Sequence, residues 1–200
     1  LGTSGNDVYV LGEVFNGLLK VGVITDFITL SLADRFALSG NSDGTISVLR
    51  KNQLTGLAET KSYFNASAFS AQDIVYDADN ERIFLLTSSE LVLLSFDPLS
   101  GAIKPLDARP TAGNSSHMVR LGNRIYIASG NSSNQSIDLF TVNSDGILSP
   151  PDNFEVNIDP DYISLNPAGT HLYLVSRSDD EIQIFELNTD NAPSGNPVSI

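Results

Sequence analysis

The stretch GNSSHMVRLGNRIYIASGN, residues 113–131, contains one of the two histidines of this 200-residue chain, followed by two arginines. An imidazole at His117 could act as a general base toward water, and a guanidinium at Arg120 or Arg124 could hold an anionic substrate or stabilise an oxyanion. The offset of three residues between His117 and Arg120 argues against their cooperation, because side chains alternate between the faces of a strand. The two side chains would converge only if a β-bulge interrupted that strand.

Both histidines also have a structural interpretation. His117 would be a polar residue at the entrance of a strand, and His171 would open the second strand of a hairpin, where long polar side chains cover a sheet edge. We predict that these structural roles are the main ones and designate no catalytic residue. His117, Arg120 and Arg124 remain the only catalytic candidates.

Carboxylates are the second group that could do chemistry. Loops predicted to lie at one end of the strands carry acidic residues, and together with His117 these form the predicted binding residues: Asp26, Asp43, Asp73, Glu90, Asp159, Asp161, Asp179 and Asp180. Such a face could bind a basic protein partner, a glycan or a cation such as calcium, since hard cations take several oxygen ligands. The alternative is that these residues solvate loops, and we predict neither a specific metal site nor a cofactor.

Composition excludes several classes of function. The chain has 24 acidic and 11 basic residues, a net charge of −13 that disfavours nucleic acids and anionic membrane surfaces as partners. It has no cysteine, which excludes disulfides, thiolate catalysis and thiolate zinc sites. No apolar run reaches the length of a membrane span. This composition is common in exported bacterial proteins, so we predict an extracellular or periplasmic location, with the cytoplasm as the alternative.

A repeat of 45 residues organises the chain. An apolar strand ends in a turn at Gly56, Gly101, Gly146 and Asn191, each 45 residues after the one before. Glycine takes a positive φ without strain and asparagine is the next best residue, so this column predicts a left-handed turn between two strands. Each repeat contains four short strand-like runs, and no segment shows helical periodicity. Four short strands in about 45 residues are typical of a β-propeller blade.

The repeat predicts an all-β propeller fragment that forms one domain. We expect a half blade made of the two outer strands at residues 1–24, then four full four-stranded blades at residues 25–70, 71–115, 116–158 and 159–200. The chain would then lack the two inner strands of its first blade. Because an open ring exposes sheet edges, we expect further polypeptide to supply the remaining blades.

The segment YISLNPAGTHLYLVSRSDDEIQIFELN, residues 162–188, resembles the repeat of the seven-bladed lactonase-type propellers, which include 6-phosphogluconolactonase-like and surface-layer YVTN proteins. The resemblance implies a seven-bladed ring. It also implies, for an active member, histidine, arginine and carboxylate groups near the central channel, with histidines just before an innermost strand, where His117 stands. The blade pattern specifies the fold more than the activity.

Two functions fit these observations. We predict a non-catalytic binding or scaffold propeller of an exported protein, which engages a protein, a glycan or a cation through its acidic loop face. The alternative is a lactone hydrolase of the 6-phosphogluconolactonase-like type, with His117 as the base. The two interpretations differ in one geometric requirement, because only the lactonase needs His117 and a guanidinium to converge on one pocket.

Overall fold

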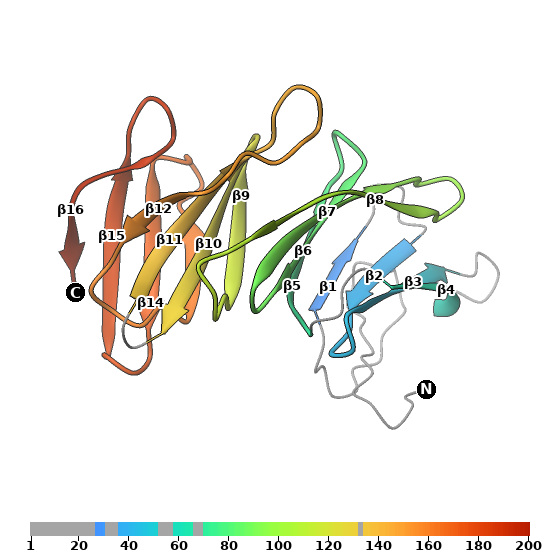
Figure 1. Ribbon diagram of the computed structural model, residues 1–200, viewed down its shortest axis with the longest axis horizontal. Helices are drawn as coiled ribbons and strands as arrows, with labels where there is room; N and C mark the ends of the chain where they lie inside the picture. Colours follow the sequence, from blue (N-terminus) through green and yellow to red (C-terminus); the bar gives the residue numbers. More distant parts are fainter. Residues whose placement is uncertain (1–26, 31–35, 52–57, 66–69, 132–133) are drawn as a thin grey trace. The chain divides into compact units, whose positions relative to one another are not determined.

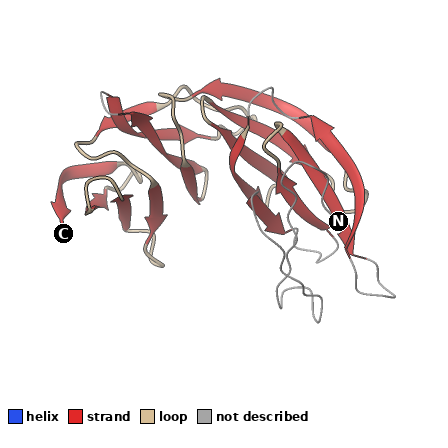
Figure 2. Ribbon diagram, turned by 90° about the horizontal axis from the view of Figure 1, so that it is seen from below, coloured by secondary structure: helices blue, strands red, loops and turns tan. Residues whose placement is uncertain are grey.

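The computed structural model describes residues 27–30, 36–51, 58–65, 70–131 and 134–200. The described residues form strands and no helix (Figure 2), so they include no helix that could cross a membrane. The chain divides into two compact units, one of Leu1–Thr87 and Val92–Asp107 and the other of Ser88–Leu91 and Ala108–Ile200.

Four sheets account for all described strands (Figure 1), and each has four strands in sequence order with antiparallel neighbours. Their bounds are β1 (Phe27–Leu30), β2 (Phe36–Gly40), β3 (Thr45–Lys51) and β4 (Ala58–Asn65); β5 (Ala71–Asp77), β6 (Arg82–Thr87), β7 (Glu90–Phe96) and β8 (Ile103–Pro110); β9 (His117–Leu121), β10 (Arg124–Asn131), β11 (Asn134–Thr141) and β12 (Asp152–Glu155); β13 (Tyr162–Leu165), β14 (His171–Ser176), β15 (Glu181–Leu187) and β16 (Pro193–Ser199). The predicted all-β class with four four-stranded sheets is therefore confirmed. The blade limits stay a prediction, and the half blade at residues 1–24 lies outside the described residues.

The column of turn residues has the backbone conformation that the repeat predicts. The φ angle is 76° at Gly101, 83° at Gly146 and 56° at Asn191, all in the left-handed region. Only glycine enters that region without a steric cost, and asparagine tolerates it better than most residues. The fourth member of the column, Gly56, lies outside the described residues.

The core of the first unit forms where apolar faces of β2, β3, β5, β6 and β7 meet. Phe36 and Phe96 pack edge to face with ring centroids 5.8 Å apart, and Tyr76 packs against Phe96 in the same way at 5.4 Å. The turn after β7 closes over this cluster, since a Cβ at Gly101 would come within 2.8 Å of the Phe36 ring. That position therefore requires glycine for its contacts as well as for its φ angle.

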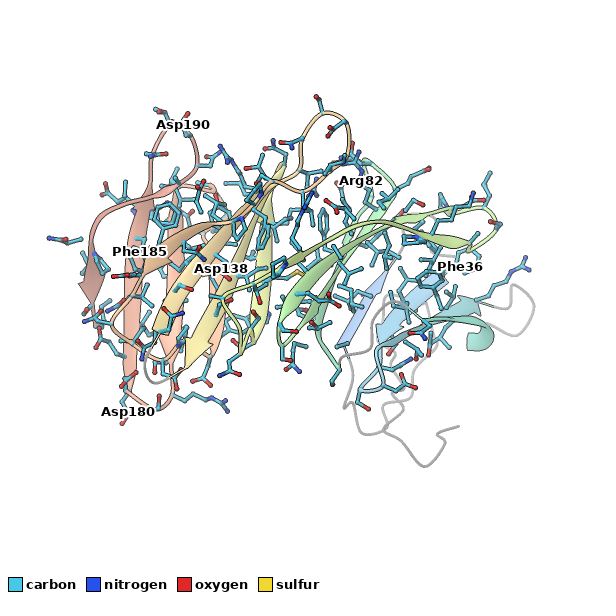
Figure 3. The ribbon with its side chains drawn as sticks, in the orientation of Figure 1. Phe36, Arg82, Asp138, Asp180, Phe185 and Asp190 are labelled. Carbon is cyan, nitrogen blue, oxygen red and sulfur yellow. The ribbon has the colours of Figure 1, made fainter. Side chains whose placement is uncertain are left out.

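The core of the second unit lies between the β9–β12 and β13–β16 sheets. Alternate residues of the strands point into it, such as Leu172 and Leu174 of β14 and Phe185 of β15 (Figure 3). The phenol of Tyr126 spans the two sheets and donates a hydrogen bond to the carbonyl of Asn191 over 2.5 Å. Burial of that phenol raises its pKa to about 12.

The buried carboxylate of Asp138, in the middle of β11, links β11 by hydrogen bonds to β12 and to the segment before β9. Its side chain has no exposed surface and accepts three hydrogen bonds, from the Ser136 hydroxyl, the Asn153 amide and the backbone N–H of Ala112, over 2.7–2.8 Å. Ala112 belongs to the segment that enters the β9–β12 sheet. The residue 45 positions later, Gln183 of β15, likewise bonds to the segment before its own sheet, at the side chain of Asn157.

Candidate functional site

Two aromatic rings stack where the first strands of the second unit's sheets begin. His117 opens β9 and Tyr162 opens β13, and their ring centroids lie 3.9 Å apart with the planes tilted by 35°. The His117 side chain is partly buried, whereas Tyr162 is 48% exposed. The stack holds the imidazole in one orientation at the surface end of these strands, which is what a proton-transferring group needs.

The two arginines that follow His117 in sequence do not join it. The pairing of β9 with β10 runs without a register shift from His117 to Leu121, so alternation places Arg120 on the other face of the strand. Arg124 pairs with Leu121 at the far end of the hairpin, about 13 Å along the strand from His117, and donates a hydrogen bond to the Thr141 hydroxyl.

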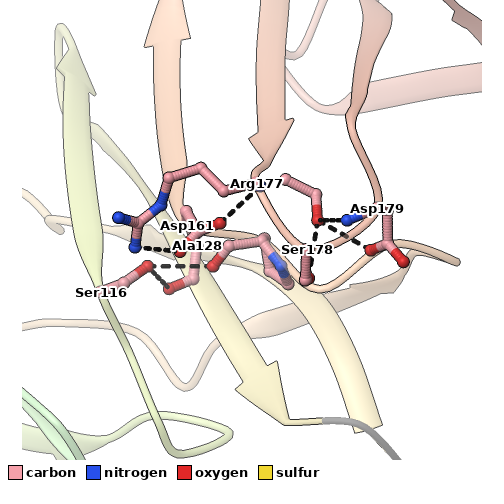
Figure 4. A network of polar contacts seen from close by, with 8 residues as sticks. Ser116, Ala128, Asp161, Arg177, Ser178 and Asp179 are labelled. Carbon is pink, nitrogen blue, oxygen red and sulfur yellow. Dashed lines mark hydrogen bonds and ion pairs between the residues drawn. The ribbon is translucent and has the colours of Figure 1, made fainter.

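A different guanidinium lies at the His117 end of the strands. Arg177, in the turn after β14, donates from its side chain to Asp161 Oδ1 and from its backbone N–H to Asp161 Oδ2, each over 2.6 Å (Figure 4). The hydroxyl of Ser116, next to His117, donates to the carbonyl of Pro160, next to Asp161, over 3.1 Å. Arg177 and Ser116, the neighbour of His117, thus both bond to the short loop at residues 159–161, which leads into Tyr162.

Arg177 is the residue that the sequence analysis missed. Its side chain is 84% exposed, so most of its five N–H donors remain available to a ligand beside the one that bonds to Asp161. The sequence could have identified Arg177, because it follows the second strand of its sheet and lies in the same loop as two predicted binding residues, Asp179 and Asp180.

Two of the predicted binding carboxylates are engaged inside this site. The side-chain and backbone hydrogen bonds from Arg177 lower the pKa of Asp161. Asp179 Oδ2 accepts from the backbone N–H of Asp159 and from the Ser176 hydroxyl, each over 2.7 Å, and these bonds lower its pKa. Both carboxylates are therefore ionised near neutral pH and hold the loops in place.

The other two predicted binding residues in loops at Ala108–Ile200 are Asp159 and Asp180. Asp159 is partly exposed in the loop before β13. Asp180 is exposed, has a φ angle of 52°, and lies at the opposite end of the β13–β16 sheet from Asp190 (Figure 3).

In the first unit, Asp43 accepts hydrogen bonds from the hydroxyl of Thr45 over 2.6 Å and from its backbone N–H over 3.0 Å. These bonds lower the pKa of Asp43, and the bond from the hydroxyl has the larger effect. Asp26 lies outside the described residues.

Two acidic residues do not lie in the loops where the sequence analysis placed them. Asp73 lies within β5, is 7% exposed and accepts the N–H of Ile74 over 2.8 Å. Glu90 is the first residue of β7 and is partly buried. The loop assignments were wrong because backbone pairing extends these strands beyond their apolar runs, with Ala71 already opposite Thr87.

In the described part of the chain, no three histidine or carboxylate side chains gather as they would around a metal ion.

Comparison with known proteins supports the fold. No protein-family model and no curated protein sequence matches the chain. Among solved structures, it is similar to a candidate 6-phosphogluconolactonase from Bacteroides uniformis, with a TM-score of 0.76 at 15% identity over 87% of this chain and 54% of that one.

Two further structures agree. A periplasmic gluconolactonase of Pseudomonas aeruginosa gives a TM-score of 0.74 at 12% identity, covering 86% of this chain and 53% of the other. A protein from Lactobacillus plantarum gives 0.72 at 19% identity, covering 92% and 62%. The chain thus has the fold of the lactonase-type, seven-bladed β-propellers and spans little more than half the length of these structures.

Proposed function

We propose that this chain forms part of a lactone hydrolase and that its site lies at the His117 end of β9 and β13. One observation carries the proposal: an imidazole held by an aromatic stack stands at the same loop as an exposed guanidinium, in a fold similar to that of gluconolactonases. The substrate class is a sugar lactone with an anionic group, because Arg177 can hold a phosphate or carboxylate through several N–H donors.

In the proposed reaction His117 acts as the general base. It takes a proton from a water molecule as the water oxygen attacks the lactone carbonyl, which gives a tetrahedral oxyanion. The bond between the carbonyl carbon and the ring oxygen then breaks, and the imidazolium returns the proton to the departing ring oxygen. The product is an open-chain sugar acid. Tyr162 acts as a positioning residue, since its ring fixes the plane of the imidazole.

A binding or scaffold role through an acidic face has less support. Asp161 and Asp179, two of the predicted binding carboxylates, each already accept two internal hydrogen bonds. Fewer carboxylate oxygens thus remain for a basic partner or a cation. An extracellular or periplasmic location also remains a proposal, which the periplasmic gluconolactonase of Pseudomonas aeruginosa supports by similarity.

The experiment compares two histidine substitutions in the intact protein, with hydrolysis of 6-phosphoglucono-δ-lactone followed by proton release. Loss of a general base costs about 100-fold to 10,000-fold in rate, so we expect His117→Ala to lower kcat/KM by at least about 100-fold. His171→Ala is the matched control, because His171 lies at the β13–β14 turn and bonds to the Thr170 hydroxyl over 2.9 Å. That variant should retain activity.

Arg177→Lys separates binding from catalysis. Lysine keeps the charge but cannot form the forked contact, so KM for the phosphorylated lactone should rise while kcat changes little. Equal activity of His117→Ala and wild type, or no activity of the wild-type protein above the spontaneous rate, would exclude the proposed function.

A further inference from the structure

A small cleft opens in the second unit beside β12, β15 and β16. It has a volume of about 250 Å³ and is lined by Glu155, Val156, Asn157, Gln183, Phe185 and Pro197. Gln183 and Phe185 are almost fully buried and form its floor, whereas Glu155 and Asn157 are exposed at its rim. The lining contains no lysine, arginine or histidine, so the cleft carries a negative charge and no positive one.

A β-bulge accounts for the opening. The pairing of β15 with β16 shifts between Ile184 and Glu186, so Phe185 has no partner residue in β16. The extra residues of β16 include Gly195, whose φ angle is 70°, and Pro197, which forms a wall of the cleft. A bulge lifts one strand from its neighbour and re-aims side chains, and here it leaves a space between Pro197 and Phe185, whose ring remains mostly buried.

Gln183 brings an unsatisfied acceptor to this floor. Its amide nitrogen donates to Asn157 Oδ1 over 2.5 Å and to Glu181 Oε1 over 3.0 Å, which uses both of its N–H bonds. Its Oε1 is buried and accepts no hydrogen bond from any described residue. A buried carbonyl without a donor is costly, so a ligand that donates a hydrogen bond here gains more than an exposed contact would give.

We propose that this cleft binds a primary alkylammonium group, from a small amine or from a lysine side chain. An ammonium group has three donors and no acceptor, which matches Gln183 Oε1 and the Glu155 carboxylate. The alkyl stem fits against Val156 and Pro197, and the ring of Phe185 favours a cation near its face. A sugar fits less well, because it carries no positive charge to pair with the Glu155 carboxylate.

The test is calorimetric titration of the protein with n-butylammonium and, at the same concentrations, with n-butanol, its neutral counterpart. We expect saturable binding of butylammonium in the millimolar range and none of butanol. Nα-acetyl-lysine methylamide distinguishes the two sources: tighter binding than butylammonium indicates a lysine side chain, and weaker binding indicates a free amine. Both results support an alkylammonium site.

Substitutions inside and outside the cleft test whether butylammonium binds there. Glu155→Gln removes the rim charge and should weaken butylammonium about 2-fold to 5-fold, the range for an exposed ion pair. Asp152→Asn is the control, since Asp152 is exposed on the same strand at an odd offset and should leave the affinity unchanged. Gln183→Met removes the acceptor and should weaken binding about 10-fold or more.

Because Gln183→Met also removes the hydrogen bonds to Asn157 and Glu181, its fold is checked by circular dichroism. If that variant does not fold, the Glu155→Gln and Asp152→Asn pair and the butanol comparison still decide the question. Equal binding of butanol, preferential binding of glucose, equal weakening by the two carboxylate substitutions, or no binding of butylammonium at about 50 mM would each overturn the proposal.

Discussion

The buried carboxylate of Asp138 offers the sharpest test of how the second unit holds together. Asp138→Ala would remove the acceptor of three hydrogen bonds at once and leave the hydroxyl of Ser136 and the N–H of Ala112 without their partner. Asn153 is exposed, so its amide can turn to water after the substitution. The cost therefore arises from the two less accessible donors rather than from all three.

Hydrogen bonds to a charged group contribute about 1.5–3 kcal/mol each, and bonds to one acceptor do not add fully. We therefore expect Asp138→Ala to lower the free energy of unfolding by about 3 kcal/mol. Asp138→Asn keeps the shape and one acceptor oxygen but turns an N–H toward a donor, so about half of that loss is expected. Both expected losses are derived from the hydrogen bonds that each substitution removes, and neither includes a contribution from lost side-chain volume.

Urea unfolding followed by far-ultraviolet circular dichroism measures these losses, with the slope m compared between variants. Asp190→Ala is the control, because Asp190 is exposed in the β15–β16 turn (Figure 3) and should stay within about 0.5 kcal/mol of wild type. An Asp138→Ala protein as stable as Asp190→Ala would refute the idea that this carboxylate joins β11 to the segment before β9.

Substitutions at Gly101, Asp161 and Tyr126 test three separate parts of the structure by the same unfolding assay. Gly101→Ala should cost about 1–2 kcal/mol more than Gly195→Ala, because both need a positive φ but only Gly101 has an aromatic carbon 2.8 Å from a new Cβ, and equal losses contradict this. Hydrogen bonds lower the pKa of Asp161, so its stabilisation exists above the unfolded pKa of about 3.9 and disappears as the pH falls through the folded value. Wild type should therefore have a higher urea midpoint than Asp161→Asn near pH 7, and this difference should shrink as the pH falls below about 3.9. Burial raises the pKa of Tyr126 to about 12, so the stability linked to its protonated phenol should be lost as the pH rises from about 10 through about 12, with Tyr126→Phe lacking that loss.

The turn positions show what could be predicted from the sequence. Gly101, Gly146 and Asn191 recur every 45 residues because each must take a positive φ, a requirement that local chemistry alone imposes. A residue type that the local backbone conformation requires can be recognised in the sequence without knowledge of any tertiary contact. The four-stranded sheets follow from the same repeat.

The site was harder to predict, because its contacts join residues far apart in the chain. The odd offset correctly separated His117 from Arg120, since it depends only on strand geometry. Arg177 and Asp161, 16 residues apart, meet only when β13 and β14 pair, and Asp138 meets Ala112 only when its sheet has formed. Asp73 was misplaced for a related reason, because strand length depends on the partner strand.

Nuclear magnetic resonance of the two imidazoles tests the proposed site most directly. The chain has two histidines, so two Hε1 signals are expected, and His171→Ala assigns them. Titration with 6-phosphogluconate, the sugar acid product, should shift the His117 signal in a saturable way and leave the His171 signal in place. A His117 signal that stays unchanged while the ligand binds, or a shift of the His171 signal alone, would contradict a lactonase site at the His117 end of β9.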